Sequence, residues 1–186
     1  MSLPHGLLGL LTYSDSTGYD LSKLFKDSLN FFWNAPTSQI YRELGRMEKA
    51  GLVSSRSIVQ DGRPNKRLYS ITPAGRDEFS RWLTDFQYTP VNCHNAFLMR
   101  IFFGAETDAE HTIRLLESFR QQCEAELASL QSSAFQNIDM YGKTVPNGEL
   151  KKGYWKATVD GGIIELKGLI EWAESSIKSI RGSEIT

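Results

Sequence analysis

The segment SQIYRELGRMEKAGLVSSRSIVQDGRPNKRLYSIT, residues 38–72, joins a helical pattern to a hairpin pattern. Its apolar residues recur at helical spacing at Ile40, Leu44, Met47 and Leu52. Gly51 is a typical helix stop, so we expect the helix to end there. Two strand-like runs follow at residues 52–59 and 67–72, with the turn signal Asp-Gly-Arg-Pro-Asn between them. The segment therefore predicts a helix that leads into a two-stranded hairpin.

The flanking sequence on both sides of this segment is helical. Residues 3–13 and 18–29 show apolar residues at helical spacing, and Thr72-Pro73 is a start signal for a further helix. The order helix, helix, helix, strand, strand, helix is that of a winged helix-turn-helix, in which the hairpin is the wing. We therefore expect a winged helix-turn-helix domain with a two-stranded wing at residues 1–88.

The rest of the chain, residues 89–186, shows helical patterns without strand patterns, so the predicted fold is mainly α with an all-helical C-terminal domain. We expect a loop at residues 134–149 and a long last helix at about residues 150–181. One stripe of this helix follows steps of four and three residues, at Val159, Ile163, Leu166, Ile170, Ala173, Ile177 and Ile180.

At 1.5 Å per residue the last helix would be roughly 45 Å long, which is enough to clamp a second copy of the chain. The stripe therefore predicts a homodimer, with residues 89–186 as the dimerisation domain. Gly161-Gly162 lowers the helix propensity in the middle of this helix. Two interpretations remain open for the glycine pair, a close crossing with another helix or a local break.

Positive charge is concentrated in the opening segment, although the whole chain has a net charge of −1. Residues 36–67 hold seven Lys or Arg against three Asp or Glu, an excess of four. The candidate residues on the helix are Ser38, Gln39, Arg42 and Arg46, and those at the hairpin are Arg63, Asn65, Lys66 and Arg67. Arg and Gln on a helix can read base edges in the major groove, and a basic hairpin can hold flanking phosphates. The combination predicts a sequence-specific regulator that binds double-stranded DNA.

Two other functions compete with DNA binding as interpretations of this pattern. A winged helix can instead be a protein–protein interaction module without DNA binding, and that alternative stays open. An enzyme is not predicted, because the sequence has no Gly-x-Ser-x-Gly elbow and no phosphate-binding glycine loop. We also expect no cofactor and no metal site, since the Cys93-His94 pair has no partner pair at zinc spacing.

The composition is that of an ordinary globular protein, 40% hydrophobic and 23% charged. No apolar run approaches the ~20 residues needed to cross a bilayer, so no membrane association is predicted. Two cysteines are too few for a disulfide framework, which indicates the cytoplasm. Cys93 is near the expected linker, and whether it is a redox sensor is left open.

Aromatic residues suggest one further partner. Trp33, Phe97, Trp155 and Trp172 are candidates for a small-molecule pocket. The other interpretation is that they pack in the core or at the dimer interface, as aromatic residues at helical spacing usually do.

The runs IYRELGRMEKAGLV and GRPNKRLYSITPAGR, with LPHGLLGLLTYSDSTGYDLSKLF before them, resemble the PadR family of bacterial transcription regulators. The length and helical character of the rest are similar to the longer branch that includes AphA-type virulence activators. The resemblance implies a winged-helix DNA-binding domain and a homodimer on a palindromic operator. It also implies that Tyr19 and Tyr41 touch the DNA backbone, that Arg63, Lys66 and Arg67 form wing contacts, and that a small aromatic compound modulates binding.

Overall fold

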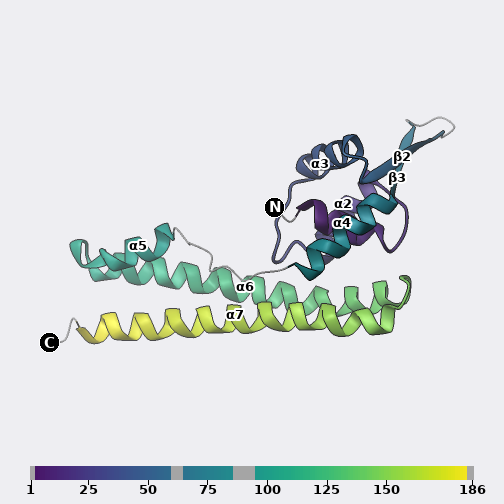
Figure 1. The fold of residues 1–186 in the computed structure, drawn as a ribbon. Coiled ribbons are helices and arrows are strands. Elements are labelled where there is room, and N and C mark those ends of the chain that lie inside the picture. The colour runs from purple at the N-terminus through teal and green to yellow at the C-terminus, as the bar shows by residue number, and fades with distance from the viewer. Residues whose placement is uncertain (1–2, 60–64, 86–94, 184–186) are drawn as a thin grey trace. The chain divides into compact units, whose positions relative to one another are not determined.

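The computed structural model describes residues 3–59, 65–85 and 95–183 and divides into two compact units. The first unit consists of residues 1–88 with residues 137–152, and the second consists of residues 89–136 with residues 153–186. Its winged helix-turn-helix fold and mainly helical character confirm the predicted fold class (Figure 1).

The first unit contains the helices α1 to α4, a small sheet, the end of α6 (Ala109–Gly142) and the start of α7 (Gly148–Ser183). The first four helices are α1 (Leu3–Leu11), α2 (Gly18–Ser28), α3 (Thr37–Lys49) and α4 (Pro73–Thr84). Its strands are β1 (Ser16–Thr17), β2 (Val53–Ile58) and β3 (Lys66–Ile71). All strand pairs are antiparallel, in the order β1-β3-β2. The apolar faces of these elements form one core, whose fully buried members include Leu7, Leu8, Leu11, Leu21, Phe25, Ile40, Leu44, Met47 and Val53.

Local signals in the sequence set the ends of α3 and α4. Gly51 has a φ of 71°, and its N–H donates to the carbonyl of Glu48 at 3.0 Å while the N–H of Leu52 donates to Met47 at 2.9 Å. This pair of bonds is a Schellman stop, which glycine favours because it adopts positive φ without a Cβ penalty. At the start of α4 the Thr72 hydroxyl accepts from the Gly75 N–H at 3.0 Å. Both predicted signals are confirmed.

Strand β1 was not predicted, because residues 14–17 have the composition of a polar turn. Ser16 pairs with Tyr69 and Thr17 with Leu68, so β1 covers the edge of β3 that β2 leaves open. An unpaired edge leaves N–H and C=O groups without partners, and β1 provides partners at Leu68 and Tyr69. Thr17 also caps α2, since its hydroxyl accepts from the Asp20 N–H at 3.2 Å.

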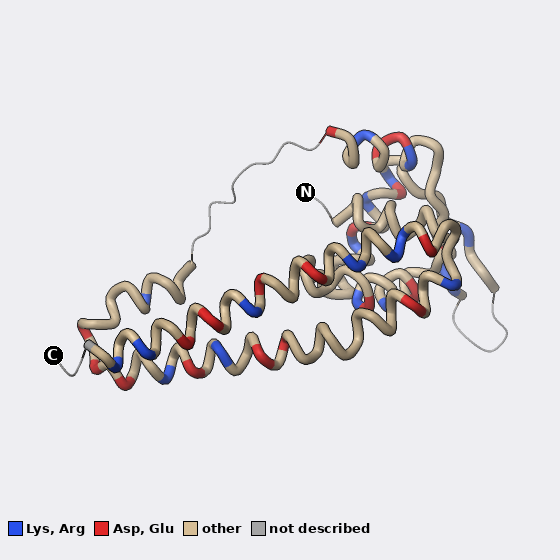
Figure 2. Tube along the Cα trace, turned by 90° about the horizontal axis from the view of Figure 1, so that it is seen from below, with Lys and Arg blue, Asp and Glu red and all other residues tan. Residues whose placement is uncertain are grey.

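The second unit is built from helices. It contains α5 (Ala96–Phe102), the short 3-10 helix η1 (Gly104–Glu106), and most of the two long helices α6 (Ala109–Gly142) and α7 (Gly148–Ser183). Arg120 of α6 pairs with Glu174 of α7 at 3.3 Å, and Arg181 pairs with Glu117 at 3.0 Å. Lys, Arg, Asp and Glu are interspersed along both long helices (Figure 2).

The loop predicted at residues 134–149 is wrong for most of its length. Helix α6 continues to Gly142, and residues 143–147 alone connect it to α7. The apolar spacing of α6 persists through Leu130, Ala134 and Ile138, which provides the helix with a packed face up to its end. The turn signals at the end of the segment mark a short connection, in which Asn147 has a φ of 54°. The predicted last helix is confirmed, with α7 extending slightly beyond it at both ends.

Candidate nucleic-acid interface

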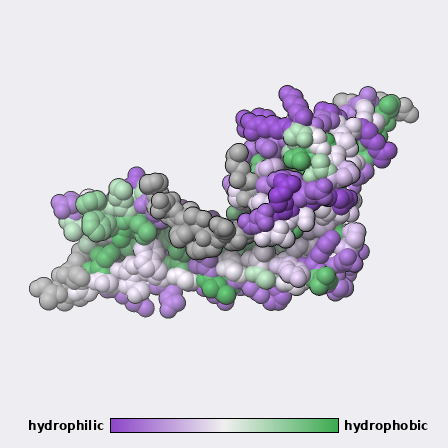
Figure 3. Space-filling view, in the orientation of Figure 1, coloured by the Kyte–Doolittle hydropathy of each residue, from purple (hydrophilic) through white to green (hydrophobic). Residues whose placement is uncertain are grey.

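Helix α3 has one apolar face and one polar face. Ile40, Leu44 and Met47 are buried in the first unit's core. The predicted contact residues Ser38, Gln39, Arg42 and Arg46 are all exposed, as is Lys49. The Arg46 side chain is 74% exposed and makes a long contact of 3.4 Å to Glu43. Hydrophilic side chains cover the surface over α3 (Figure 3), so this face can bind a polyanion without any change in the fold of the domain.

Helix α2 approaches α3 closely at Gly18. A Cβ on Gly18 would overlap the Tyr41 ring, so the close approach depends on the absence of a side chain there. Tyr41 remains 46% exposed beside Gly18, and Tyr19 is exposed at the start of α2. The two tyrosines thus lie near the junction of the helix-turn-helix, and their contact with DNA stays a prediction.

The wing places its basic residues on two different faces. Ser57 pairs with Arg67 and Ile58 with Lys66, and side chains alternate between faces along a strand. Arg67 therefore shares a face with Ser55, whereas Lys66 lies on the opposite face. Asn65 and Lys66 are exposed at the start of β3. The predicted contact Arg63 lies outside the described residues.

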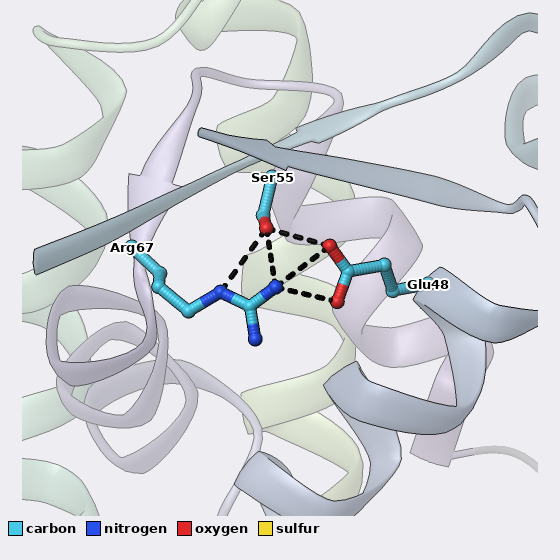
Figure 4. A network of polar contacts seen from close by, with 3 residues as sticks. All are labelled: Glu48, Ser55 and Arg67. Carbon is cyan, nitrogen blue, oxygen red and sulfur yellow. Dashed lines mark hydrogen bonds and ion pairs between the residues drawn. The ribbon is translucent and has the colours of Figure 1, made fainter. Parts of the chain in front are cut away.

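Arg67 is engaged with a carboxylate and a hydroxyl through Nη2 and Nε, while its side chain is 57% exposed. Its Nη2 donates to both carboxylate oxygens of Glu48, at 2.8 and 2.9 Å, and its Nε and Nη2 donate to the Ser55 hydroxyl at 3.2 and 2.8 Å (Figure 4). The Ser55 hydroxyl donates in turn to Glu48 at 2.6 Å. No local spacing signals this network, because its members come from three different elements.

Arg56 contributes to the positive charge of residues 36–67 but is not among the predicted contact residues. It pairs with Leu68 across the hairpin, and the alternation of strand side chains places it on the same face as Lys66. Arg56 is exposed. Arg56 could have been identified from the alternation of the expected strand, which places Ser54, Arg56 and Ile58 on one face.

A second polar contact in the first unit joins α2 to residues near the end of α6. The Tyr141 hydroxyl donates to the Asp27 carboxylate at 2.8 Å, and the Asn137 side chain donates to the Asp27 carbonyl at 2.9 Å. Burial, and then the bond to Asp27, raises the pKa of Tyr141 to about 12. The Lys151 ammonium lies 4.0 Å from the centroid of the Tyr13 ring, and burial lowers the pKa of Lys151. This contact could not be predicted, because a loop was expected at residues 134–149.

The predicted dimerisation stripe of α7 is partly covered within a single chain. Val159, Ala173 and Ile177 are buried, and Ile163, Leu166, Ile170 and Ile180 are half-buried. Ile177 packs in a cluster with Ile113 and Leu116 of α6. An apolar stripe indicates that a helix is covered but not which helix covers it, and here α6 of the same chain covers part of the stripe. Helix α7 is continuous through Gly161-Gly162, so no break occurs there.

Large apolar side chains stay exposed on α5 and beside it. These are Leu98, Met99, Phe102 and Phe103. Phe102 is 80% exposed, and hydrophobic surface gathers over α5 (Figure 3). We call these four residues the α5 patch. A patch of this kind typically marks a contact with another molecule.

The four candidate ligand residues are not brought to one place. Phe97 and Trp172 lie 6.3 Å apart between ring centroids and pack with Phe119, which stacks on Phe97 at 4.7 Å. Trp155 is about 25 Å from Trp172 along α7 at 1.5 Å per residue. Trp33 belongs to the first unit and is partly exposed. Phe97 and Trp172 thus pack together in the second unit's apolar cluster.

Within residues 3–59, 65–85 and 95–183, no group of three or more His, Cys, Asp or Glu could hold a metal ion. No helix in the same described ranges is long and apolar enough to span a membrane. Cys93 and His94 lie outside them. Cys123 is buried, which raises the pKa of its thiol, with Glu126 and Glu124 adding to the effect.

Two family models match the chain. The model of the transcriptional regulator PadR-like family matches residues 7–81, and that of the virulence activator alpha C-terminal region matches residues 94–181. The negative transcriptional regulator PadR of Bacillus subtilis is 31% identical over 131 residues, which cover 70% of this chain and 72% of that protein. The chain belongs to the PadR-like family of transcriptional regulators.

Solved structures agree with this assignment. Bacillus subtilis PadR in complex with operator DNA has a TM-score of 0.80 and 27% identity, covering 97% of this chain and 99% of that one. The Vibrio cholerae virulence activator AphA has a TM-score of 0.75 and 25% identity, covering 98% and 99%. Bacillus subtilis PadR in complex with p-coumaric acid shares the fold, with a TM-score of 0.75 and 24% identity over 96% and 94% of the two chains.

Proposed function

We propose that this PadR-like regulator binds double-stranded operator DNA through α3 and the wing. The observation that carries the proposal is the exposed row of Ser38, Gln39, Arg42 and Arg46 on the face of α3 opposite the core. An α-helix fits the major groove, where arginine pairs with guanine and glutamine with adenine. A relative that covers nearly the whole chain has been solved with operator DNA, which supports the proposal.

In this assignment the wing lies on the DNA flanking the α3 contacts. Lys66 and Arg56 share one exposed face of the hairpin, and Asn65 lies beside its tip. Lysine and arginine side chains on such a hairpin can neutralise backbone phosphates. Arg63 is assigned to the same role from the sequence alone. Tyr19 and Tyr41 are assigned to the backbone by resemblance to the family.

We further propose that the regulator acts as a homodimer on a palindromic operator. Two α3 helices related by a two-fold axis would read half-sites about 34 Å apart, which one winged helix cannot do. We assign DNA binding to residues 1–88 and dimerisation to residues 89–186, in the cytoplasm. The α5 patch and the half-covered stripe of α7 support a second copy as the partner of the second unit.

A small aromatic effector is the last part of the proposal. The complex of Bacillus subtilis PadR with p-coumaric acid supports this class of compound. Phe97 and Trp172 are the two candidate residues that the fold brings together. Quenching of tryptophan fluorescence by p-coumaric acid and related phenolic acids tests the idea, and no response to the whole panel would refute it.

The test of DNA binding starts from duplexes selected from a random pool. We expect Arg42→Ala to weaken binding to the selected operator by about 1–3 kcal/mol, the cost of one base contact. Arg114→Ala on α6, which removes the same charge from another exposed position, should bind like the parent. A chain that binds no duplex in a salt-dependent manner would contradict the proposal and favour the protein-interaction module.

A further inference from the structure

Glu48, Ser55 and Arg67 form a closed network that we call the wing clamp (Figure 4). The Arg67–Glu48 pair is charge-assisted, and Ser55 bonds to both of its members. Glu48 lies near the end of α3, Ser55 lies on β2 and Arg67 lies on β3. The wing clamp therefore joins the last turn of α3 to both strands of the wing.

The wing clamp changes what Arg67 can offer to DNA. Its positive charge is paired with the Glu48 carboxylate, and Nε and Nη2 are already used in hydrogen bonds. The guanidinium carbon also lies 5.7 Å from the centroid of the buried Tyr69 ring. Binding a phosphate through the same nitrogens would require breaking the pair with Glu48. Lys66, on the opposite face of β3, lies outside this network.

The position of the wing clamp on the hairpin determines which residues of the wing it can orient. Ser55 pairs with Tyr69, and three further residue pairs extend from there to Ile58 and Lys66. A two-stranded hairpin is marginally stable by itself, so its direction depends on contacts at its base. Arg67 pairs with Ser57, so the clamp extends from the Ser55 pair to the pair next to Ile58 and Lys66. Loss of the clamp therefore removes a contact that fixes the direction of the outer basic residues relative to α3.

We propose that Arg67 is a positioning residue of the DNA interface rather than a phosphate contact. Through Glu48 and Ser55 it sets the angle between α3 and the wing. That angle determines whether Lys66 and its neighbours reach the flanking backbone while α3 occupies the major groove. The inference rests on the proposed function, because it requires that α3 and the wing bind one duplex.

The experiment measures the affinity of the full-length chain for its selected operator at several salt concentrations. The variants are Arg67→Ala, Arg67→Lys, Glu48→Gln and the double variant Glu48→Gln with Arg67→Ala, and Lys66→Ala is the matched control. Thermal unfolding of each variant verifies that it is folded, since partly exposed ion pairs contribute little to stability. A second duplex, trimmed of its flanking base pairs, removes the DNA that the wing would touch.

If Arg67 is a positioning residue, Arg67→Ala and Glu48→Gln each weaken operator binding by about fivefold, and the double variant is no weaker than either one. Because a misdirected wing loses its phosphate contacts, the dependence of log affinity on log salt becomes less steep in these variants, even in Glu48→Gln, which removes no positive charge. Lys66→Ala reduces the slope by about 0.9. Arg67→Lys behaves like Arg67→Ala, because an ammonium does not reproduce the guanidinium fork. All variants bind the trimmed duplex like the parent.

If Arg67 is a phosphate contact, Arg67→Ala lowers the salt slope by about 0.9, Arg67→Lys restores it, and Glu48→Gln strengthens binding by freeing the guanidinium. That result overturns the inference and leaves the proposed function intact. Unchanged affinity in both single variants also overturns the inference. A parent chain that binds no duplex overturns the proposed function, and the inference with it.

Discussion

The exposed surfaces of α3 and α5 differ in chemistry, although both helices are short and each lies at the surface of its own unit. Helix α3 buries its apolar stripe and exposes serine, glutamine and arginine side chains. Helix α5 has no buried residue and exposes Leu98, Met99 and Phe102. The first surface suits a polyanion, and the second suits another apolar surface. The comparison supports our proposal that the two units bind different kinds of partner.

The largest expected effect comes from the buried residues of each unit. Leu44 of α3 and Leu116 of α6 both have no exposed surface. Replacing either residue with alanine should cost about 2–5 kcal/mol, because a cavity remains in a packed core. Chemical denaturation of the two variants, with operator binding measured in parallel, checks this. We expect Leu44→Ala to reduce DNA binding more than Leu116→Ala does. Equal losses of DNA binding would contradict the separation of roles.

The next effect concerns the α5 patch. Phe102→Ser should raise the dissociation constant of the homodimer by about 30-fold, equivalent to about 2 kcal/mol, if Phe102 is an aromatic anchor of the interface. Its cost in folding stability should stay within about 0.5 kcal/mol, since the side chain is exposed. Sedimentation equilibrium measures the dimer. Leu83→Ser, an exposed apolar residue of the first unit, is the matched control and should leave the dimer unchanged.

A smaller effect is expected at the contact between α2 and α6. Tyr141→Phe removes the hydrogen bond to Asp27 and should cost about 1–2 kcal/mol. The pKa of Tyr141 is raised from 10.0 to about 12 in the folded chain, so folding favours the neutral hydroxyl. Its contribution is complete below pH 10 and is lost as the pH rises toward 12.

Urea denaturation between pH 8 and pH 11.5 tests whether the contribution of Tyr141 to stability falls as the pH rises. The parent should lose stability relative to Tyr141→Phe as the pH rises, because the variant has no phenol to ionise at this position. Tyr154→Phe, on the exposed surface of α7, should keep the parental pH dependence. A constant difference between the parent and Tyr141→Phe across this range would show that the contact is not made.

The smallest effect uses one helix glycine in each unit. Gly45 of α3 and Gly161 of α7 have open space around the position of a Cβ. Replacing either glycine with alanine should stabilise the chain by about 0.5–1 kcal/mol, because glycine is unfavourable inside a helix. Thermal unfolding measures this gain. A loss of operator affinity in Gly45→Ala, or of dimer affinity in Gly161→Ala, would locate a partner against that glycine.

Much of the first unit could be predicted from local patterns. The spacing of Ile40, Leu44 and Met47, the glycine stop at Gly51 and the cap at Thr72 each act within a few residues. Such signals are visible in the sequence because the physical cause lies in neighbouring residues. Strand β1 was missed because two residues are too short to show any period.

The candidate site was only partly accessible from the sequence. The exposed side of α3 follows from helix geometry once its apolar stripe is known. The sequence does not reveal that the positive charge of Arg67 is paired, because its partner Glu48 is 19 residues away in the chain. The same limit applies to α7, where periodicity revealed the stripe around Ile177 but not that α6 covers it.

The sequence by itself determined the order of the predicted elements, the end of α3 at Gly51 and the local excess of positive charge. These depend on backbone preference and residue spacing, which act over a few neighbouring residues. Only the tertiary structure decided that Arg67 pairs with Glu48, that Ser16–Thr17 completes the sheet and that α6 covers part of the α7 stripe. Those contacts join residues distant in the chain, so they exist only after the elements have packed.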